Sequence, residues 1–490
     1  MARFIALDLG AESGRVIVAD VEDNGISLNE CHRFATGAVR VRGTLRWDAL
    51  GLLREIKAGL CKARQEYGEE YASLGVDTWG IDYALLDRNG DLVSNPFCYR
   101  DPRTQGVMER ALEVIPRQDI FEKSGGIQFL SINTLYQLYS MVLSGSKQLE
   151  IADSFLMMPD LFNYWLTGCK TNEFTNATTT QFYDSGAGTW SRDMLQSLGI
   201  PPKLFSEVVQ PGTEIGHLIE EIREDTGLPA LPVVAPATHD TASAVVAVPA
   251  QGNRFAWLSS GTWSLPGALS SRPLVSGAAL DYNISSYGGA DRGFLPWKNV
   301  MGLWLVQECR RKWAREGNEL GYDQLTRMAA EADAFRAVID PDDPSFLVPD
   351  DMPKAIQSYC HRTGQAVPET KGEIVRTALE GLALKYRWVY EKLELLLGEQ
   401  FEAIHVVGGG AKNSLLCQFT ADASQLPVVA GPVEATALGN VAVQAVATGY
   451  LGSLDEARML IRQDADVMTY EAGGGDRWDE AYARFDKLTG

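Results

Sequence analysis

An aspartate ends the first apolar run of the chain, FIALDLGAESGRVIVAD (4–20). Asp8 is followed by a turn with glycine and serine, and Arg15 stands just beyond that turn. Because an unpaired carboxylate at the end of a buried strand is unfavourable, a compensating charge is expected, and a divalent cation with its waters is one candidate. The N–H groups of the turn could hold phosphate oxygens. An ordinary hairpin in which Asp8 pairs with Arg15 is the alternative.

A second aspartate stands before a run of small apolar residues, in APATHDTASAVVAV (235–248). Asp240 or Thr241 could cap the helix that this run predicts. A carboxylate at the start of a helix is also held ionised by the helix dipole, and it can accept a proton from a substrate hydroxyl. The two roles are compatible. His239 has no second histidine at ligand spacing, which favours a structural or substrate hydrogen bond over a metal ligand.

Two glycine-bearing stretches in the second half of the chain could also approach a ligand. SSGTW (259–263) has the small, hydroxylated character of the first turn, so the two turns could close on a polyphosphate from both sides. VVGGGAKNSLL (406–416) runs from a strand through three glycines into a helix, where backbone can meet a flat or anionic ligand. It is not the dinucleotide fingerprint, which needs a glycine where Asn413 stands. A purely structural strand-to-helix turn is the alternative.

The residues around the first aspartate predict a hairpin, then a helix, then a strand. Residues 4–20 have β-rich flanks around a turn, which is typical of a hairpin. Asp48 is placed to cap a helix whose apolar residues recur at helical spacing, namely Ala49, Leu52, Leu53, Ile56 and Leu60. Residues 73–86 return to strand character before an Asn89-Gly90 turn.

A similar order of elements returns past the midpoint. Residues 254–269 predict a second β-hairpin, residues 374–397 a long amphipathic helix, and residues 403–410 a strand. The halves therefore resemble diverged copies, each with strands and helices in alternation, which predicts a largely parallel α/β sheet in each. We place the boundary near Pro249, with domains of 1–249 and 250–490, and expect an active site between them.

Length, charge and cysteine usage restrict the classes of protein that remain. A chain of 490 residues with 45% hydrophobic and 22% charged residues is typical of two globular domains. The formal net charge of -20 disfavours nucleic acid and membrane surfaces as partners, although backbone N–H groups and a cation can still hold a small phosphate compound. The seven scattered cysteines include no C-x-x-C pair, and no apolar stretch could span a bilayer. A cytoplasmic protein with reduced thiols is expected.

These motifs, together with several others in the same order, resemble the FGGY family of carbohydrate kinases over essentially the whole chain. Each motif is weak alone, and their combination is specific. The resemblance rests on DLGAESGR (8–15), GVDTWGIDYALLD (75–87), YRDPRT (99–104), GIQFLSINTLYQL (126–138), TNATTTQ (175–181), HDTASAV (239–245), SSGTWSL (259–265), NVMGLWLVQE (299–308), VGGGAKN (407–413) and GPVEATALGN (431–440).

The resemblance implies an α/β fold of two ribonuclease-H-like domains, of the actin, hexokinase and Hsp70 type, with the active site in the interdomain cleft. It implies ATP and Mg²⁺ as cofactors, with Asp8 near the metal ion. The residues it places around ATP are Ala11, Glu12, Ser13, Gly14, Arg15, Thr262, Gln307 and Gly409. The residues it places around the sugar are Gly80, His239, Asp240, Thr241 and Asn299.

Within the family, the chain is most similar to kinases that act on L-rhamnulose. This implies phosphorylation of the sugar at its primary hydroxyl to the 1-phosphate, with Asp240 as general base. A kinase for another ketose, such as L-fuculose or a ketopentose, is the nearest alternative, and an actin- or Hsp70-like ATPase without a sugar substrate is a further one. A monomer or weak homodimer is expected.

Two departures from the family pattern qualify the resemblance. Met158 and Pro159 stand where many members carry a lysine before the aspartate, which agrees with the L-rhamnulose branch. Glu12 lies inside the phosphate loop, where an acidic side chain is unfavourable beside phosphate, so only its backbone is carried over.

Overall fold

The computed structural model describes residues 2–252 and 254–489, which fold into two compact units. The first unit contains the chain up to Pro249 and two later segments, Ser270–Pro296 and Ala435–Asp464. The second contains Ala250–Leu269, Trp297–Glu434 and the chain from Ala465. The units are therefore not continuous halves of the chain, and the domain division at residue 249 stays a prediction.

The first unit is built on a six-stranded sheet with the order β13-β14-β6-β1-β2-β3. Its strands are β1 (Ala2–Leu9), β2 (Ser13–Glu22), β3 (Gly25–Ala35), β6 (Ser73–Thr78), β13 (Glu214–His217) and β14 (Pro232–Val234). The predicted hairpin of residues 4–20 is confirmed as β1 and β2, which pair antiparallel. β1 pairs parallel with β6, and β6 with β14.

Helices and small two-stranded sheets complete the first unit. The helices are α1 (Ala49–Tyr67), α2 (Val107–Val114), α3 (Arg117–Lys123), α4 (Thr134–Leu143), α5 (Lys147–Ile151), α6 (Met158–Thr167), α7 (Phe174–Ala177), α8 (Arg192–Ser197), α9 (Glu220–Thr226), α10 (Asp240–Val246), α11 (Gly277–Tyr282), α17 (Ala435–Ala447) and α18 (Leu454–Asp464). The strands of the two-stranded sheets are β4 (Val39–Val41), β5 (Thr44–Arg46), β7 (Tyr83–Leu86), β8 (Ser154–Met157), β9 (Asn172–Glu173), β10 (Tyr183–Asp184), β11 (Thr189–Trp190) and β12 (Val208–Val209). A further short strand of this unit, β17 (Ser285–Gly288), belongs to none of them.

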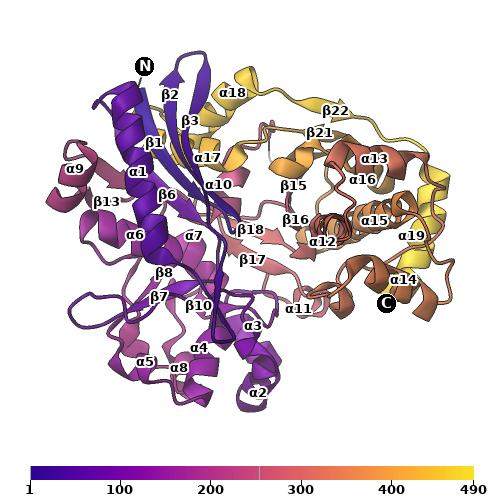
Figure 1. The fold of residues 1–490 in the computed structure, drawn as a ribbon, viewed down its shortest axis with the longest axis horizontal. Coiled ribbons are helices and arrows are strands. Elements are labelled where there is room, and N and C mark those ends of the chain that lie inside the picture. Colours follow the sequence, from indigo (N-terminus) through magenta and orange to yellow (C-terminus); the bar gives the residue numbers. More distant parts are fainter. Residues whose placement is uncertain (1, 253, 490) are drawn as a thin grey trace. The chain divides into compact units, whose positions relative to one another are not determined.

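The two faces of the central sheet are covered by different helices. Alternate residues of β1, namely Ile5, Leu7 and Leu9, belong to an apolar core with residues of α1 and α6. Asp48 caps α1 as predicted, since its side chain accepts a hydrogen bond from Gly51 N at 3.1 Å. The opposite face of β1 contacts α17, which comes from near the end of the chain (Figure 1).

The second unit has its own sheet, which contains β16, β15, β20, β21 and β22 in that order. Its elements are β15 (Phe255–Ser260), β16 (Trp263–Gly267), β19 (Val300–Met301), α12 (Trp304–Arg315), α13 (Tyr322–Glu331), α14 (Met352–Arg362), α15 (Lys371–Leu397), β20 (Ala403–Val407), α16 (Ser414–Ser424), β21 (Val428–Ala430), β22 (Met468–Tyr470) and α19 (Gly475–Thr489). The predicted second hairpin is confirmed as β15 and β16. The predicted strand 403–410 ends at Val407, because Gly408 leaves the extended conformation with φ +81.

The two sheets repeat one series of strand pairings. In the first unit, β13-β14 is antiparallel, β14-β6 and β6-β1 are parallel, and β1-β2 is antiparallel. In the second unit, β22-β21, β21-β20, β20-β15 and β15-β16 follow the same series. The expectation of largely parallel sheets is therefore wrong: both sheets are mixed, because each carries a hairpin at one side and an antiparallel strand at the other.

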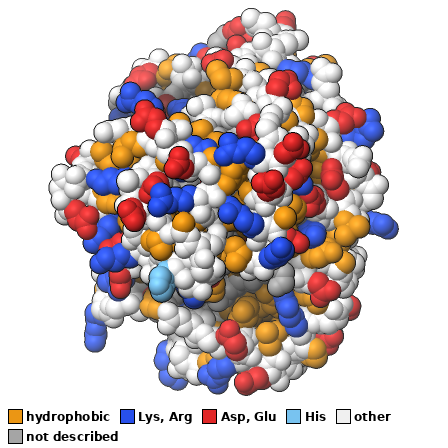
Figure 2. Space-filling model, turned by 90° about the vertical axis from the view of Figure 1, so that its right-hand side faces the viewer, with side chains coloured by type: hydrophobic (Ala, Val, Ile, Leu, Met, Phe, Trp, Pro, Cys, Tyr) orange, Lys and Arg blue, Asp and Glu red, His pale blue; other side chains and the backbone are white. Residues whose placement is uncertain are grey.

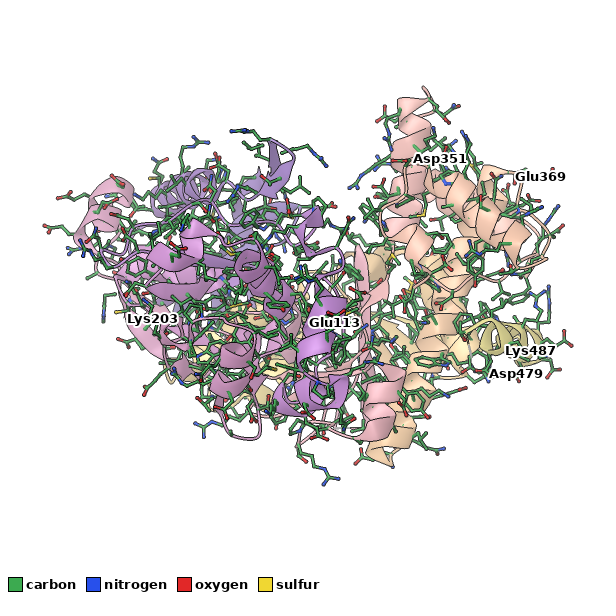
Figure 3. All side chains as sticks on the ribbon, turned by 90° about the horizontal axis from the view of Figure 1, so that it is seen from below. Glu113, Lys203, Asp351, Glu369, Asp479 and Lys487 are labelled. Carbon is green, nitrogen blue, oxygen red and sulfur yellow. The ribbon has the colours of Figure 1, made fainter. Side chains whose placement is uncertain are left out.

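The long helix α15 packs against α13, α16 and α19 in the second unit. It begins three residues before the predicted Ile374, because Thr370 and Glu373 form a capping box at its start. On α19, Asp479 accepts a hydrogen bond of 2.6 Å from Arg387 of α15; Figure 3 labels Asp479. This ion pair helps to hold the C-terminal helix on the unit.

The surface carries mixed charge on the face drawn in Figure 2, where acidic and basic side chains are interspersed. Within residues 2–252 and 254–489, no helix combines the length and the apolar character that crossing a membrane requires.

Candidate active site

The turn between β1 and β2 holds the first candidate aspartate. Asp8 is 6% exposed, and it forms an ion pair with Arg15, its Cα partner on β2. The pairing of Asp8 with Arg15, which the sequence offered as the alternative to a metal site, is thus present. The turn is closed by a hydrogen bond from Gly10 N to Ser13 O at 3.0 Å, and Thr36 Oγ1 donates to Gly10 O at 2.6 Å.

The remaining residues of this turn are arranged as a loop that presents backbone. Ala11 and Ser13 are half-buried, whereas Glu12 is exposed, so its carboxylate is in contact with solvent. Gly14 is required for packing, because a Cβ there would lie 2.5 Å from two ring carbons of Phe34. The five predicted phosphate-loop residues therefore lie together beside Asp8: Ala11 and Glu12 lie in the turn, and Ser13, Gly14 and Arg15 begin β2.

A further aspartate, which the sequence reasoning did not single out, lies beside Asp8. Asp77 on β6 is the Cα partner of Asp8 across the parallel pair, and it is fully buried. Its Oδ2 accepts a hydrogen bond from Asn440 Nδ2 at 2.6 Å, whereas its Oδ1 has no hydrogen-bond partner. Burial raises the pKa of Asp77 well above its usual range, and the neighbouring carboxylate of Asp8 adds to the rise. Only the strand register reveals this neighbour of Asp8.

These carboxylates fit a hydrated divalent cation better than a cation held by protein ligands alone. Within the described part of the chain, no group of three or more His, Cys, Asp and Glu side chains is arranged to hold a metal ion. Magnesium usually keeps several waters and binds through one or two carboxylates together with substrate phosphates. A buried, unpaired carboxylate oxygen of Asp77 beside Asp8 suits such an ion, because water bound to the ion can donate to it.

The second candidate aspartate is the first residue of α10. The helix run predicted from HDTASAV is confirmed, but the N-cap position belongs to His239, so capping by Asp240 or Thr241 is wrong. Asp240 Oδ1 instead accepts hydrogen bonds from Thr241 N at 2.5 Å and Thr241 Oγ1 at 3.1 Å. Burial raises the pKa of Asp240 to about 6, although these hydrogen bonds oppose the rise. With 30% of its side chain exposed, this carboxylate is accessible to a substrate and ionised at neutral pH.

His239 and Gly80 lie next to each other, close to Asp240. His239 Nε2 is 3.6 Å from Asp240 Oδ1, and burial lowers the pKa of His239 to about 3. The imidazole is therefore neutral at neutral pH, so its contact with Asp240 is not an ion pair. A Cβ on Gly80 would lie 3.1 Å from His239 Nε2 and 3.0 Å from Thr179 Cγ2. Four predicted sugar-site residues, Gly80 and 239–241, are thus brought together.

The chain that follows Gly80 is strained and firmly held. Ile81 has φ +64, which is unusual for a β-branched residue, and its N–H donates to Thr179 Oγ1 at 3.0 Å. The next residue, Asp82, is fully buried and accepts hydrogen bonds from the indole N–H groups of Trp47 at 2.6 Å and Trp79 at 3.1 Å. Burial raises the pKa of Asp82 to about 6. These contacts hold Gly80 in place against His239.

A buried glutamate holds the chain that leads into α10. Glu173 accepts hydrogen bonds from Thr238 N at 3.1 Å and Thr238 Oγ1 at 2.6 Å, and also from Thr175 N and Oγ1 at 2.8 and 2.6 Å. Thr175 Oγ1 is in turn the acceptor for His239 N at 3.1 Å. Glu173 is not predicted from the sequence, although it stands two residues before the start of the TNATTTQ motif.

The second unit presents its own turn, between β15 and β16. Thr262 lies in this turn, and its hydroxyl donates to Gln307 Oε1 at 3.1 Å. The carbonyl oxygen of Thr262 accepts hydrogen bonds from Gly302 N and Trp304 N, both at 3.1 Å. The start of α12, which carries Gln307, is thereby attached to the turn. Thr262 and Gln307 are therefore neighbours, as their common assignment to ATP requires.

The three glycines after β20 have different roles. Gly408 has φ +81, and a Cβ on Gly410 would overlap Ser260 Oγ at the end of β15. A Cβ on Gly409, in contrast, would meet no atom within 4 Å. Gly409 therefore faces open space at the carboxyl ends of the parallel strands β15 and β20, where ligands commonly bind in α/β proteins.

Asn299 is the one predicted sugar-site residue that belongs to the second unit. Its Oδ1 accepts a hydrogen bond from Trp297 Nε1 at 3.3 Å. Thr262, Gln307 and Gly409 belong to the same unit, whereas Asp8, the phosphate turn and residues 239–241 belong to the first.

Two family models match the chain. The N-terminal domain of the FGGY family of carbohydrate kinases matches residues 3–247, and the C-terminal domain of the same family matches residues 256–448. Together they cover most of the 490 residues.

Curated relatives match over nearly the full length. A rhamnulokinase of Bacteroides thetaiotaomicron is 42% identical over 482 residues, which are 98% of this chain and 98% of the relative. A rhamnulokinase of Halalkalibacterium halodurans is 42% identical over 466 residues, which are 95% of this chain and 98% of the relative.

Solved structures share the fold at low sequence identity. A gluconate kinase from Lactobacillus acidophilus superposes with a TM-score of 0.83 at 15% identity, covering 99% of this chain and 97% of that one. Plasmodium falciparum glycerol kinase with ADP gives a TM-score of 0.78 at 15% identity, covering 100% of this chain and 98% of that one. The fold expected from the sequence, two actin- and hexokinase-like α/β domains, is therefore confirmed.

Proposed function

The chain belongs to the FGGY family of carbohydrate kinases, and from this we propose that it transfers the γ-phosphoryl group of ATP to L-rhamnulose, giving L-rhamnulose 1-phosphate. The observation that carries the proposal is the 42% identity to a rhamnulokinase over 98% of both chains. The match spans nearly the whole chain, so it also covers the segments that contain the proposed sugar-binding residues.

Asp240 is the proposed general base. A carboxylate whose pKa is about 6 is ionised at neutral pH, and it is a stronger base than an ordinary aspartate. It would accept the proton of the sugar's primary hydroxyl while that oxygen forms its bond to the γ-phosphorus and the bond to the β-phosphate oxygen breaks. Help of this kind is typically worth about 10² to 10⁴ in rate.

The residues next to Asp240 would bind and orient the sugar. Neutral His239 can donate or accept one hydrogen bond from a sugar hydroxyl without introducing charge. Gly80 lets the sugar approach His239, because a side chain at this position would occupy the space beside the imidazole. Thr241 and Asn299 add polar groups that complete the proposed set.

Residues 11–15, which are the turn and the start of β2, would bind the phosphates of ATP through backbone N–H groups and Arg15. Asp8 and the unpaired oxygen of Asp77 suit a hydrated Mg²⁺ bound together with ATP, which would neutralise charge on the phosphate oxygens. In the second unit, Thr262, Gln307 and Gly409 would bind the rest of the nucleotide, with Gly409 leaving space for a flat group.

A panel of ketoses tests the proposal. ADP release is measured with L-rhamnulose, L-fuculose, D-xylulose and L-ribulose, each with MgATP and at several concentrations. We expect the highest kcat/KM for L-rhamnulose and no significant ADP release without sugar. A higher kcat/KM for another ketose would make that ketose the substrate in place of L-rhamnulose. An ATP turnover rate that stays the same with and without every sugar would overturn the kinase assignment. The cytoplasmic location and the monomeric or weakly dimeric state stay predictions.

A further inference from the structure

Three charged side chains form a row on one face of the first sheet. Asp8 is the Cα partner of Arg15 on one side and of Asp77 on the other. Partners in register on neighbouring strands point to the same face, so all three side chains share the face that α17 covers. Asp77 is thus the carboxylate adjacent to the proposed metal-binding residue.

The position of Asp77 leaves one of its oxygens without a partner. It is fully buried, and its Oδ1 makes no hydrogen bond, although buried carboxylate oxygens are normally satisfied. The strand register places Asp77 directly beside Asp8, and burial together with the carboxylates of Asp8 and Asp240 raises its pKa. An unpaired oxygen in this position calls for a donor that arrives with a ligand.

Helix α17 determines how the Asp77 carboxylate is oriented. Asn440 Nδ2 donates to Asp77 Oδ2 at 2.6 Å, and Asn440 Oδ1 accepts a hydrogen bond from Gln444 Nε2 at 2.6 Å. Gly75 allows these amides to reach the sheet, because a Cβ there would lie 2.6 Å from Asn440 Oδ1. Asn440, the last residue of the GPVEATALGN motif, thus orients the Asp77 carboxylate by this hydrogen bond.

The same helix supports the segment that carries Asp240. A Cβ on Gly439 would overlap the carbonyl oxygen of Ser243, so α17 and α10 approach each other backbone to backbone. Consecutive residues of α17, Gly439 and Asn440, therefore contact the helix of the proposed base and the carboxylate beside Asp8.

We propose that Asp77 is a positioning residue for hydrated Mg²⁺, with Oδ1 accepting a hydrogen bond from a water of the ion and Asn440 holding the carboxylate in place. The inference rests on the proposed function. A purely structural role, in which Asp77 only joins β6 to α17, would affect stability alone. The two roles therefore differ in how a variant binds nucleotide with and without metal.

The test measures ADP binding by calorimetry with Mg²⁺ and without it, in the parent and in Asp77→Asn. Asparagine keeps the volume and a hydrogen bond to Asn440 but loses the negative charge. The Kd for ADP without Mg²⁺, divided by the Kd with Mg²⁺, measures how much the metal ion strengthens ADP binding. This measurement requires no turnover. We expect this ratio to fall at least about tenfold in Asp77→Asn, because removing a group that supports a bound metal ion typically lowers metal affinity by about 10- to 100-fold. ADP binding without metal should be nearly unchanged.

A matched control comes from another buried aspartate of the same unit. Asp160 on α6 is fully buried and also has an unpaired Oδ1, but its carboxylate lies beside Glu173 rather than Asp8. Asp160→Asn should leave the Kd ratio at the parent value. An equal fall in both variants would show that the loss of any buried carboxylate is enough, and this would overturn the proposal.

A second variant decides the matter if Asp77→Asn does not fold. Asn440→Ala keeps the Asp77 carboxylate but removes its partner, so the ratio should fall by about two- to fivefold. A parent-like ratio in the folded Asp77→Asn protein, or in Asn440→Ala if that is the folded variant, refutes the role of Asp77. If the parent itself shows no metal-linked ADP binding and no ketose-dependent turnover, the proposed function fails, and this inference with it.

Discussion

Replacing Asp240 by asparagine should slow the reaction and stabilise the protein at the same time. The variant keeps the side-chain volume, and its carbonyl oxygen can still accept the hydrogen bond from Thr241 N. It removes the group that would take the proton from the sugar hydroxyl, so we expect kcat to fall by about 10² to 10⁴. It also removes a charge whose burial is unfavourable, so the variant should gain stability at the pH values at which Asp240 is ionised.

The pKa of Asp240 rises from the ordinary 3.8 to about 6 because burial disfavours its charged form. A carboxyl with a raised pKa in the folded state destabilises the fold when ionised, so the free energy of unfolding falls as the pH rises from about 4 to about 6 and is then level. At about 1.4 kcal/mol per pKa unit, the full effect is about 3 kcal/mol. Because 30% of the side chain is exposed, solvent screening reduces it, and we expect about 1 to 3 kcal/mol.

Urea unfolding of the parent and of Asp240→Asn, followed by tryptophan fluorescence, measures this difference across the pH range. The variant should be more stable by about 1 to 3 kcal/mol at about pH 7. The gain should shrink toward about pH 4 and vanish below it, where Asp240 becomes protonated in both the folded and the unfolded state. Loss of the Asp240 charge also relieves repulsion of Asp77, which acts in the same direction. A variant with no stability gain at neutral pH, or with a gain that does not vary with pH, would refute the reasoning about burial. Turnover within a few-fold of the parent would show that Asp240 is not the base.

Two further perturbations test the neighbouring groups. Gly410→Ala should lower the free energy of unfolding by about 1 to 3 kcal/mol, because its Cβ would overlap Ser260 Oγ. Gly409→Ala, whose Cβ would meet no atom, should leave stability unchanged and raise the KM for ATP. Equal losses of stability in chemical denaturation would contradict this contrast. Glu173→Ala should lower the free energy of unfolding by about 3 to 5 kcal/mol, because the hydroxyl and N–H of Thr238 lose their buried acceptor. A change below about 1 kcal/mol in the same assay would mean that the carboxylate does not hold this chain segment.

The local elements around the candidate site follow from the amino-acid sequence, because their signals are short-range. Alternating apolar residues and a turn predict the 4–20 hairpin, and the Asp48 cap predicts the start of α1; both are present. Helix α10 and the second hairpin are also where their residues predict. Asp8 and Asp240 are likewise predicted from residue types next to a turn and a helix start, whereas Gly80 follows only from the resemblance to the family.

What the sequence could not determine depends on contacts between segments far apart in the chain. Strand register makes Asp77 the neighbour of Asp8, and Asn440 reaches Asp77 across 363 positions of sequence. The return of Ala435–Asp464 to the first unit has no local signal, because it is decided by which surfaces bury one another. The same applies to the pKa of Asp240 and to the identity of the helix N-cap, since burial and hydrogen-bond geometry exist only once the chain has packed. Short-range signals in the sequence thus specify the elements and the reactive residue types, whereas long-range packing specifies which of them act on one another.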